Sequence, residues 1–357
     1  MKITFVLPFD GRRPVGGFKV VYEYANRLVE MGHQVTLIHP AGLYLGVGKN
    51  DWWLRNIAKY LLFLPTRHDL PKHWFELSSR VDVRWVPTLT QCFIPRADVI
   101  IATAWETAEW VASYGLDRGR KFYLVQHLED WNGDRQRVLS TWKLPLQKIV
   151  ISRWLGDLAC SMDESSEYIP NGLDFNTFGV DVDPAKRRPN NILMLHHPLE
   201  WKGTKAGLVA IEKVRAAGLD VKLTMFGVKM PKPGEFPEWA RFEQLPTKAR
   251  LRQLYNEAAI FVSPSWAEGW ALPPAEAMQC GCATVLTDIG GHEYAIQGKT
   301  SLLSDPQDSA AMAHNIVTLL KDNDFRIRLA KSGVEEIAQY TWTRASAALE
   351  AILIKSA

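Results

Sequence analysis

Two glutamates in one short stretch have the types and the spacing to bind a sugar attached to phosphate. Glu268 and Glu276 are separated by seven residues, and Pro273 and Pro274 between them favour the start of a helix. A helix start offers free backbone N–H groups and a positive dipole, which suit phosphate. Carboxylates repel phosphate but accept hydrogen bonds from hydroxyls. The pattern therefore predicts phosphate at the amides and sugar hydroxyls at the carboxylates.

A simpler interpretation of the same residues stays open. Glu276, in the expected first turn of the helix, would complement the helix dipole, and Glu268 would be solvated. Spacing alone does not separate this interpretation from a sugar-nucleotide site.

Apolar runs flank the predicted helix. Residues 259–263 and 283–286 read as buried strands, and Gly281 can end the helix between them. The chain opens in a similar way, with a strand at residues 2–8, a glycine-containing loop, a helix at residues 18–31 and a second strand. Such alternation is typical of Rossmann-like units, in which ligands bind beyond the carboxyl ends of the strands.

The stretch EGWALPPAEAMQCGCATVLTDIGG, at residues 268–291, resembles the E-x7-E signature of the retaining family-4 ("group 1") glycosyltransferases, which have the GT-B fold. It departs from the family pattern at Ala271 and Cys282, where glycine and proline are usual, and neither change removes a charged group. The sequence IPNG at residues 169–172 resembles the family's hinge between domains.

The resemblance implies an α/β chain of the GT-B fold, in which two Rossmann-like domains face a cleft. An N-terminal acceptor domain is expected at residues 1–168, completed by a C-terminal helix at residues 342–357. A C-terminal nucleotide-sugar domain is expected at residues 175–340. A chain of 357 residues has room for both domains.

The resemblance also implies a donor site. Glu276 is expected to bind ribose hydroxyls. Glu268, which would bind a hydroxyl of the donor sugar, and Lys202, which would neutralise the leaving diphosphate, are taken as catalytic residues of this half of the chain. The other expected donor-binding residues are Gly16, Gly17, His197, Gly227, Leu245, Gly269, Trp270, Ala271 and Leu272. The amides of the last three would hold sugar and phosphate oxygens, and the loops with Gly227 and Leu245 would enclose the base.

His197 stands where the family has an arginine that grips the diphosphate. Histidine is mostly neutral at pH 7 and cannot form a bidentate contact. Either His197 becomes charged and substitutes for the arginine, or another cation does. The adjacent His196 could suggest a metal, but no carboxylate has a supporting spacing, so no metal is expected.

Two further strand ends in the N-terminal half are candidates. A strand at residues 121–127 ends in His127, which by resemblance contacts the donor sugar and is taken as catalytic; otherwise it is a polar cap. Thr103 and Trp105 follow a strand at residues 97–102 and are expected to bind acceptor, although Trp105 could belong to the core.

The stretch between Trp52 and Trp74 mixes aromatic, leucine and basic residues. That mixture favours a membrane interface or a lipid-linked acceptor. The alternative is a helix packed under a loop.

Bulk properties narrow the setting. A net charge of +3 and a pI of about 8.5 are too weak to indicate nucleic acid. The N-terminus does not read as a signal peptide, no apolar run approaches the ~20 residues of a membrane span, and four cysteines without a disulfide or zinc pattern indicate reduced thiols. A cytoplasmic protein is expected, with peripheral contact at the inner membrane face as an option.

The resulting hypothesis is a retaining, metal-independent transferase that moves a hexose to a glycan or lipid-linked acceptor. No cofactor is expected beyond the nucleotide-sugar co-substrate, for which a UDP-hexose is the default. A non-catalytic nucleotide-sugar-binding subunit of a transferase complex is the first alternative, and a GT-B phosphorylase or epimerase is the second.

Overall fold

A computed structural model describes residues 1–12, 14–43, 52–65, 70–71, 74–131, 133–231, 234 and 236–355. The chain divides into two compact units. One consists of Met1–Asn171 with Trp342–Ala357, and the other is Gly172–Thr341. These bounds lie within a few residues of the domain ranges expected from the sequence.

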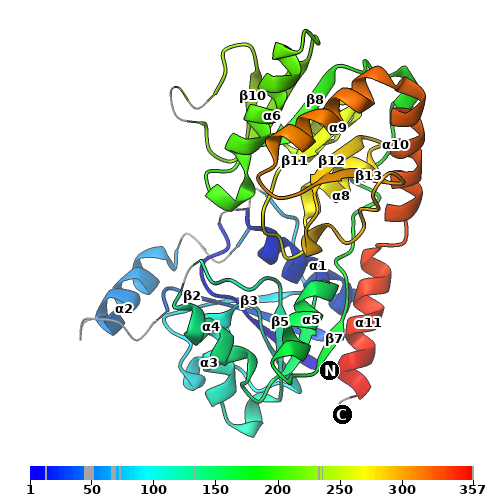
Figure 1. Cartoon of the computed structure of the whole chain (residues 1–357). Helices are drawn as coiled ribbons and strands as arrows, with labels where there is room; N and C mark the ends of the chain where they lie inside the picture. The colour runs from blue at the N-terminus through cyan, green and yellow to red at the C-terminus, as the bar shows by residue number, and fades with distance from the viewer. Residues whose placement is uncertain are drawn as a thin grey trace. The chain divides into compact units, whose positions relative to one another are not determined.

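The first unit is built on a parallel sheet with the strand order β3-β2-β1-β4-β5-β6-β7. Helices alternate with the strands along the chain (Figure 1). The elements are β1 (Lys2–Val6), α1 (Gly16–Glu30), β2 (Gln34–Pro40), α2 (Trp52–Phe63), β3 (Asp82–Val86), β4 (Val99–Ala102), α3 (Trp105–Ser113), β5 (Arg120–Val125), α4 (Arg135–Trp142), β6 (Gln147–Val150), α5 (Arg153–Ser161), β7 (Ser166–Tyr168) and α11 (Trp342–Lys355).

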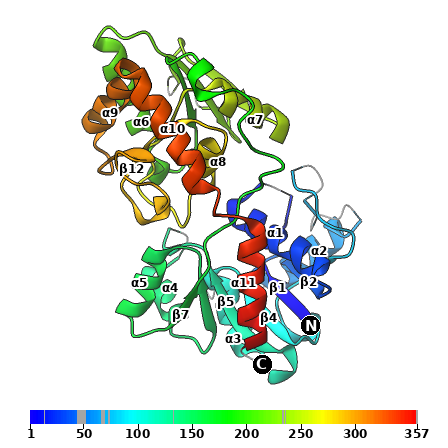
Figure 2. The ribbon, with the colours of Figure 1, turned by 90° about the vertical axis from the view of Figure 1, so that its right-hand side faces the viewer.

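The last helix completes the first unit. Figure 2 shows α11 running beside α1, and the two helices pack together. The ring of Trp342 meets Tyr24 of α1 edge to face, with centroids 5.4 Å apart. Further along α11, Glu350 lies 2.7 Å from His33. The chain therefore returns to its N-terminal unit after passing through the second one.

The second unit repeats the same topology, with the parallel order β10-β9-β8-β11-β12-β13. Its elements are the 3-10 turn η3 (Pro184–Lys186), β8 (Asn191–Leu195), η4 (Glu200–Lys202), α6 (Thr204–Ala216), β9 (Lys222–Gly227), β10 (Arg241–Gln244), α7 (Lys248–Glu257), β11 (Ile260–Ser263), α8 (Leu272–Gln279), β12 (Ala283–Thr287), η5 (Gly290–His292), β13 (Ser301–Ser304), α9 (Ser309–Lys321) and α10 (Asn323–Ile337). In both units the strand order reverses direction between the first and fourth strands, which is where such sheets bind ligands.

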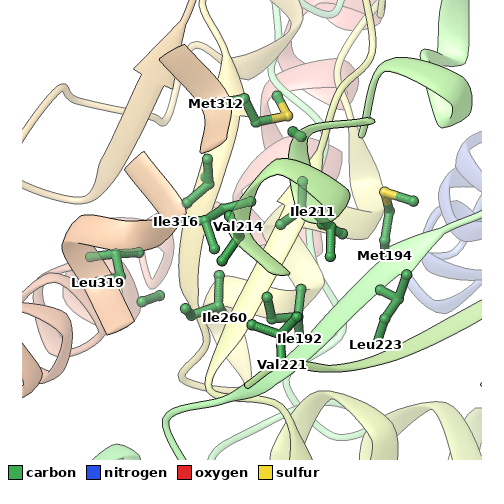
Figure 3. Packing of buried hydrophobic residues seen from close by; sticks show 14 of the residues in the cluster. Ile192, Met194, Ile211, Val214, Val221, Leu223, Ile260, Met312, Ile316 and Leu319 are labelled. Atoms are coloured by element: carbon green, nitrogen blue, oxygen red, sulfur yellow. The ribbon is translucent and has the colours of Figure 1, made fainter. Parts of the chain in front are cut away.

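Apolar side chains on both faces explain why these strands are central and parallel. On one face of the second sheet, Ile192 and Ile260 pack against Ile211 and Val214 of α6 and Ile316 of α9 (Figure 3). The opposite face carries a second buried cluster under α7 and α8. The strand at residues 283–286 and the helix ended by Gly281, whose φ is 83°, are confirmed.

One local expectation is wrong. Helix α8 begins at Leu272, with prolines in its first positions, so Glu276 lies in the second turn rather than the first. The influence of the helix dipole fades beyond the first turn. The simpler interpretation, in which Glu276 only complements that dipole, is therefore weakened.

Candidate active site

Glu268 and Lys202 form the centre of the site. The Lys202 ammonium donates to both carboxylate oxygens of Glu268, at 2.8 Å each. Only 13% of the Glu268 side chain is exposed, so the alternative of a solvated Glu268 is wrong. Burial alone would raise the pKa of Glu268, but the adjacent Lys202 charge outweighs it and holds the pKa below its ordinary value. The carboxylate is therefore ionised at neutral pH.

The turn η4 places Lys202 against the loop after β11. The amide of Trp266 donates to the carbonyl of Trp201 at 2.6 Å, which ties the two segments together. Gly203 ends η4 with a left-handed φ of 67°, and a Cβ at Gly203 would lie 1.9 Å from the carbonyl oxygen of Pro264. Only glycine fits both the conformation and the space.

Replacing Gly203 with alanine should lower stability by about 3 kcal/mol, because a left-handed alanine costs about 1–2 kcal/mol and the clash adds a similar amount. Gly218→Ala is the matched control, since Gly218 is also left-handed at 82° but has open space around it. Urea unfolding midpoints would measure both variants. Equal losses would contradict the close contact with Pro264.

Glu276 lies on α8 and is only 6% exposed. Its Oε2 accepts a hydrogen bond from the hydroxyl of Tyr255 at 3.2 Å. A small cavity of about 30 Å³ is lined by Lys202, Glu268 and the prolines at the start of the same helix. The residues predicted for sugar, diphosphate and ribose thus come from neighbouring segments of one unit.

In the segment between the two glutamates, N–H groups already donate hydrogen bonds to other groups of the protein. The Ala271 amide donates to the carbonyl of Gly291 at 2.9 Å, so the predicted contact of this N–H with a donor oxygen is contradicted in this conformation. Trp270 is buried, and its indole N–H donates to Glu293 at 3.1 Å. Leu272 begins α8, and its predicted contact remains a prediction, as does that of Gly269.

His197 does not supply the missing positive charge. Burial, and then the nearby Lys202 charge, lower the pKa of His197 to about 4, so the ring is neutral at pH 7. Of the two interpretations of this position, the one in which another cation replaces the arginine is therefore favoured over a charged His197. Its Nδ1 accepts the Leu199 amide at 3.2 Å, which leaves the proton on Nε2. A neutral N–H donor is what this position can offer a phosphate oxygen.

Gly227 and Leu245 lie together, as expected for two loops around a base. The Leu245 amide donates to the carbonyl of Gly227 at 2.8 Å. A Cβ at Gly227 would lie 2.5 Å from the carbonyl oxygen of His196, so this strand end needs glycine. Leu245 has a φ of 48° and is 53% exposed, so its side chain presents an apolar surface there.

In the first unit, Gly16 and Gly17 form the first turn of α1. A Cβ at Gly17 would lie 3.2 Å from the Gln126 side chain, so this helix start approaches the end of β5. His127 follows Gln126, with its ring centroid 4.4 Å from that of Trp131. Gly17 and His127 therefore come from neighbouring segments of this unit, and their predicted contacts with the donor stay predictions.

Thr103 and Trp105 are both buried. The Thr103 hydroxyl donates to the carbonyl of Val6 at 2.8 Å, and the Arg137 guanidinium lies 5.2 Å from the Trp105 ring. This packing favours the alternative that Trp105 belongs to the core. Acceptor binding by either residue stays a prediction.

The sequence did not identify two residues that lie near the candidate site residues, His292 and Glu129. His292 in η5 is buried and donates from Nδ1 to the Thr287 carbonyl at 2.8 Å. Burial raises the pKa of Glu129, after β5, to about 8. Neither residue has a local sequence signal that distinguishes it from a loop residue. Among the described residues, no three His, Cys, Asp or Glu side chains lie together in a way that would hold a metal.

Several known proteins resemble this chain in sequence or in fold. Residues 191–322 match the family model described as glycosyl transferases group 1. The O-antigen chain mannosyltransferase B of Escherichia coli is 25% identical over 58% of this chain and 55% of its own length, so the match spans about half of that protein. The phosphatidyl-myo-inositol mannosyltransferase of Mycolicibacterium smegmatis is 23% identical over 97% of this chain and 92% of its own length. The Anabaena protein HepE, solved with UDP-glucose, superimposes with a TM-score of 0.73 at 16% identity, over 99% of this chain and 100% of that one.

Proposed function

Because this chain belongs to the group 1 glycosyl transferases and has the GT-B fold, we propose that it moves a hexose from a UDP-sugar to a glycan or lipid-linked acceptor. We further propose that the transfer retains the anomeric configuration and needs no metal. The observation that carries the proposal is the Lys202–Glu268 pair beside the start of α8, the helix that also holds Glu276.

The chemistry follows from where charge develops. Breaking the anomeric C–O bond puts negative charge on the diphosphate and positive charge on the sugar. Lys202 is positioned to offset the first, and the Glu268 carboxylate can accept a donor-sugar hydroxyl once Lys202 turns to the diphosphate. Glu276 would accept from the ribose hydroxyls. The two glutamates have different partners here, so we do not assign them as a glycosidase acid and nucleophile.

The relatives support the choice of substrates. HepE was solved with UDP-glucose, which favours UDP as the nucleotide. The names of the two mannosyltransferases describe a glycan-chain product and a phosphatidyl-inositol acceptor. A glycan or lipid-linked acceptor for this chain is consistent with both.

The test is acceptor-dependent release of UDP. Purified protein would be incubated in EDTA with UDP-glucose, UDP-galactose or UDP-N-acetylglucosamine, with and without a panel of octyl glycosides. We expect UDP release that requires both a donor and an acceptor, and a product that keeps the donor's anomeric configuration by NMR. Loss of turnover in EDTA, or an inverted product, would contradict the corresponding part of the proposal.

One observation favours a second candidate, a non-catalytic nucleotide-sugar-binding subunit. The neutral His197 leaves one side of the expected diphosphate site without the family's cation. A protein of this kind would bind UDP, but it would form no free UDP from a UDP-sugar when acceptor is added. Acceptor-dependent release would exclude it. Isomerised donor or a requirement for phosphate would instead indicate the epimerase or phosphorylase alternative.

Helix α2 supports a peripheral contact with membrane. Leu54, Ile57 and Leu61 recur at helical spacing on α2 and are 37–59% exposed. Leu62 is 69% exposed, and Leu64, directly after the helix, is 42% exposed. The alternative of a packed helix is therefore contradicted for these side chains, as far as the described residues show. Arg55 is also exposed on this helix. The side chains of Trp52 and Trp53 and residues 66–69 and 72–73 of the predicted stretch lie outside the described residues.

None of the helices in the described ranges is both long and apolar enough to cross a bilayer.

We expect the double variant Leu61→Ser/Leu62→Ser to bind vesicles of phosphatidylcholine and phosphatidylglycerol at least tenfold more weakly, because each buried leucine contributes about 1.5–3 kcal/mol. Leu116→Ser is the control, since Leu116 is 93% exposed in the same unit but outside α2. Vesicle sedimentation would measure both. Unchanged binding of the double variant would count against a membrane-facing α2, and with it against activity at the inner membrane face.

A further inference from the structure

Tyr255 is a buried phenol in an apolar surrounding. It lies on α7 and is fully buried. Its ring is held by Phe178, Phe226 and Phe261, whose centroids are 5.7, 5.9 and 5.8 Å away. A phenylalanine would fill the same space, so packing alone does not require the hydroxyl.

The hydroxyl points at a residue of the proposed donor site. It donates to Oε2 of Glu276 at 3.2 Å, from α7 to α8. Burial, and then the Glu276 charge, raise the pKa of Tyr255 well above its ordinary value, so the phenol stays protonated and remains a donor. A buried hydroxyl without a partner would destabilise the fold, which makes this contact a fixed one.

Hydrogen bonds also fix the backbone close to Tyr255 and Glu276. The Tyr255 carbonyl accepts from Arg187 Nη1 at 3.1 Å and from the Cys282 thiol at 3.0 Å. Arg187, which is buried, also donates to the carbonyl of Cys280 at the end of α8. The C-terminal ends of α7 and α8 are thus joined through one guanidinium, which keeps Tyr255 in register with Glu276.

We propose that Tyr255 is a positioning residue for nucleotide binding, which orients the Glu276 carboxylate toward the ribose hydroxyls of the donor. This inference rests on the proposed function, since it takes Glu276 as the ribose-binding group. One hydrogen bond from Tyr255 uses one of about four acceptor positions of a carboxylate and restricts its rotation. The ribose then meets a carboxylate that is already oriented, which lowers the entropic cost of binding.

The experiment compares Tyr255→Phe with wild-type protein by calorimetric titration of two probes, UDP and 2′,3′-dideoxy-UDP. The variant should bind UDP about tenfold more weakly than wild type does, and it should bind dideoxy-UDP with the same affinity as wild type. The reason is that only UDP has the ribose hydroxyls that would donate hydrogen bonds to Glu276. Tyr114→Phe is the matched control. Its buried hydroxyl donates to the carbonyl of Leu89 in the first unit, so it should alter neither titration. Thermal melting of each variant would establish that it is folded.

Two results would overturn the inference. Equal weakening toward both probes would mean that Tyr255 acts through packing, and unchanged UDP affinity would mean that its hydroxyl does not matter. A parallel titration of Glu276→Ala separates these from failure of the proposed function. If that variant keeps wild-type UDP affinity, the ribose contact itself is wrong. If it loses affinity while Tyr255→Phe does not, only the positioning role falls.

Discussion

Replacing Glu276 with alanine should weaken UDP binding on the order of 100-fold. A carboxylate that receives ribose hydroxyls makes charge-assisted hydrogen bonds of about 1.5–3 kcal/mol each, and a tenfold change corresponds to about 1.4 kcal/mol. Glu276 is 6% exposed, so water does not readily replace the lost carboxylate. The measurement is calorimetric titration of UDP, GDP and ADP in the presence of EDTA, on wild type and variant.

The exposed Glu212 on α6 provides the control for this titration. Glu212→Ala removes the same group from the same unit and should leave all three affinities unchanged. A folded Glu276→Ala protein that binds as wild type does would refute the ribose contact. Tight binding of one nucleotide to wild type would identify the donor class. If wild type binds none of the three, the hexosyltransferase proposal weakens and the non-catalytic alternative gains.

Local signals in the sequence were sufficient for the elements around this site. Pro273 and Pro274 mark the start of α8 and Gly281 its end, because each restricts the backbone in a known way. The start was still misplaced by one residue, and that moved Glu276 out of the first turn. A side chain's position on a helix depends on the cap, which in α8 is Ala271 and carries no capping side chain.

Contacts between distant segments could not be predicted in this way. Lys202 and Glu268 are both visible as motif residues, but nothing local indicates that they pair with each other across 66 positions. Tyr255 reads as an ordinary apolar position of an amphipathic helix, and its hydroxyl acquires a role only because α7 packs on α8. The low pKa of His197 could not be predicted from its sequence either, because its largest cause is burial, which depends on how the whole unit packs.

The second large effect is expected at Lys202. Lys202→Ala should lower kcat by about 10²–10³, since losing one preorganised donor to a developing negative charge costs about 2.7–4 kcal/mol. The effect should be larger on kcat than on KM if Lys202 acts mainly on the leaving diphosphate. Burial, the larger cause of the low pKa of His197, remains in the variant, so we expect His197 to stay neutral and not to take over the charge. Steady-state kinetics with the donor that wild type uses would measure both constants.

Because Lys202 pairs with Glu268, the Lys202→Ala variant also reports on the titration of the Glu268 carboxyl. Without Lys202, burial of Glu268 loses the largest effect that offsets it, so the pKa of this carboxyl should rise and donor KM should become dependent on pH. Adding Glu268→Gln to Lys202→Ala removes that titration without restoring kcat, which separates the orphaned carboxyl from the missing ammonium. Lys205→Ala, an exposed lysine at the start of α6, is the matched control and should behave as wild type. If Lys202→Ala keeps wild-type kcat, the leaving diphosphate must be stabilised by other groups, and the ion pair with Glu268 would be structural.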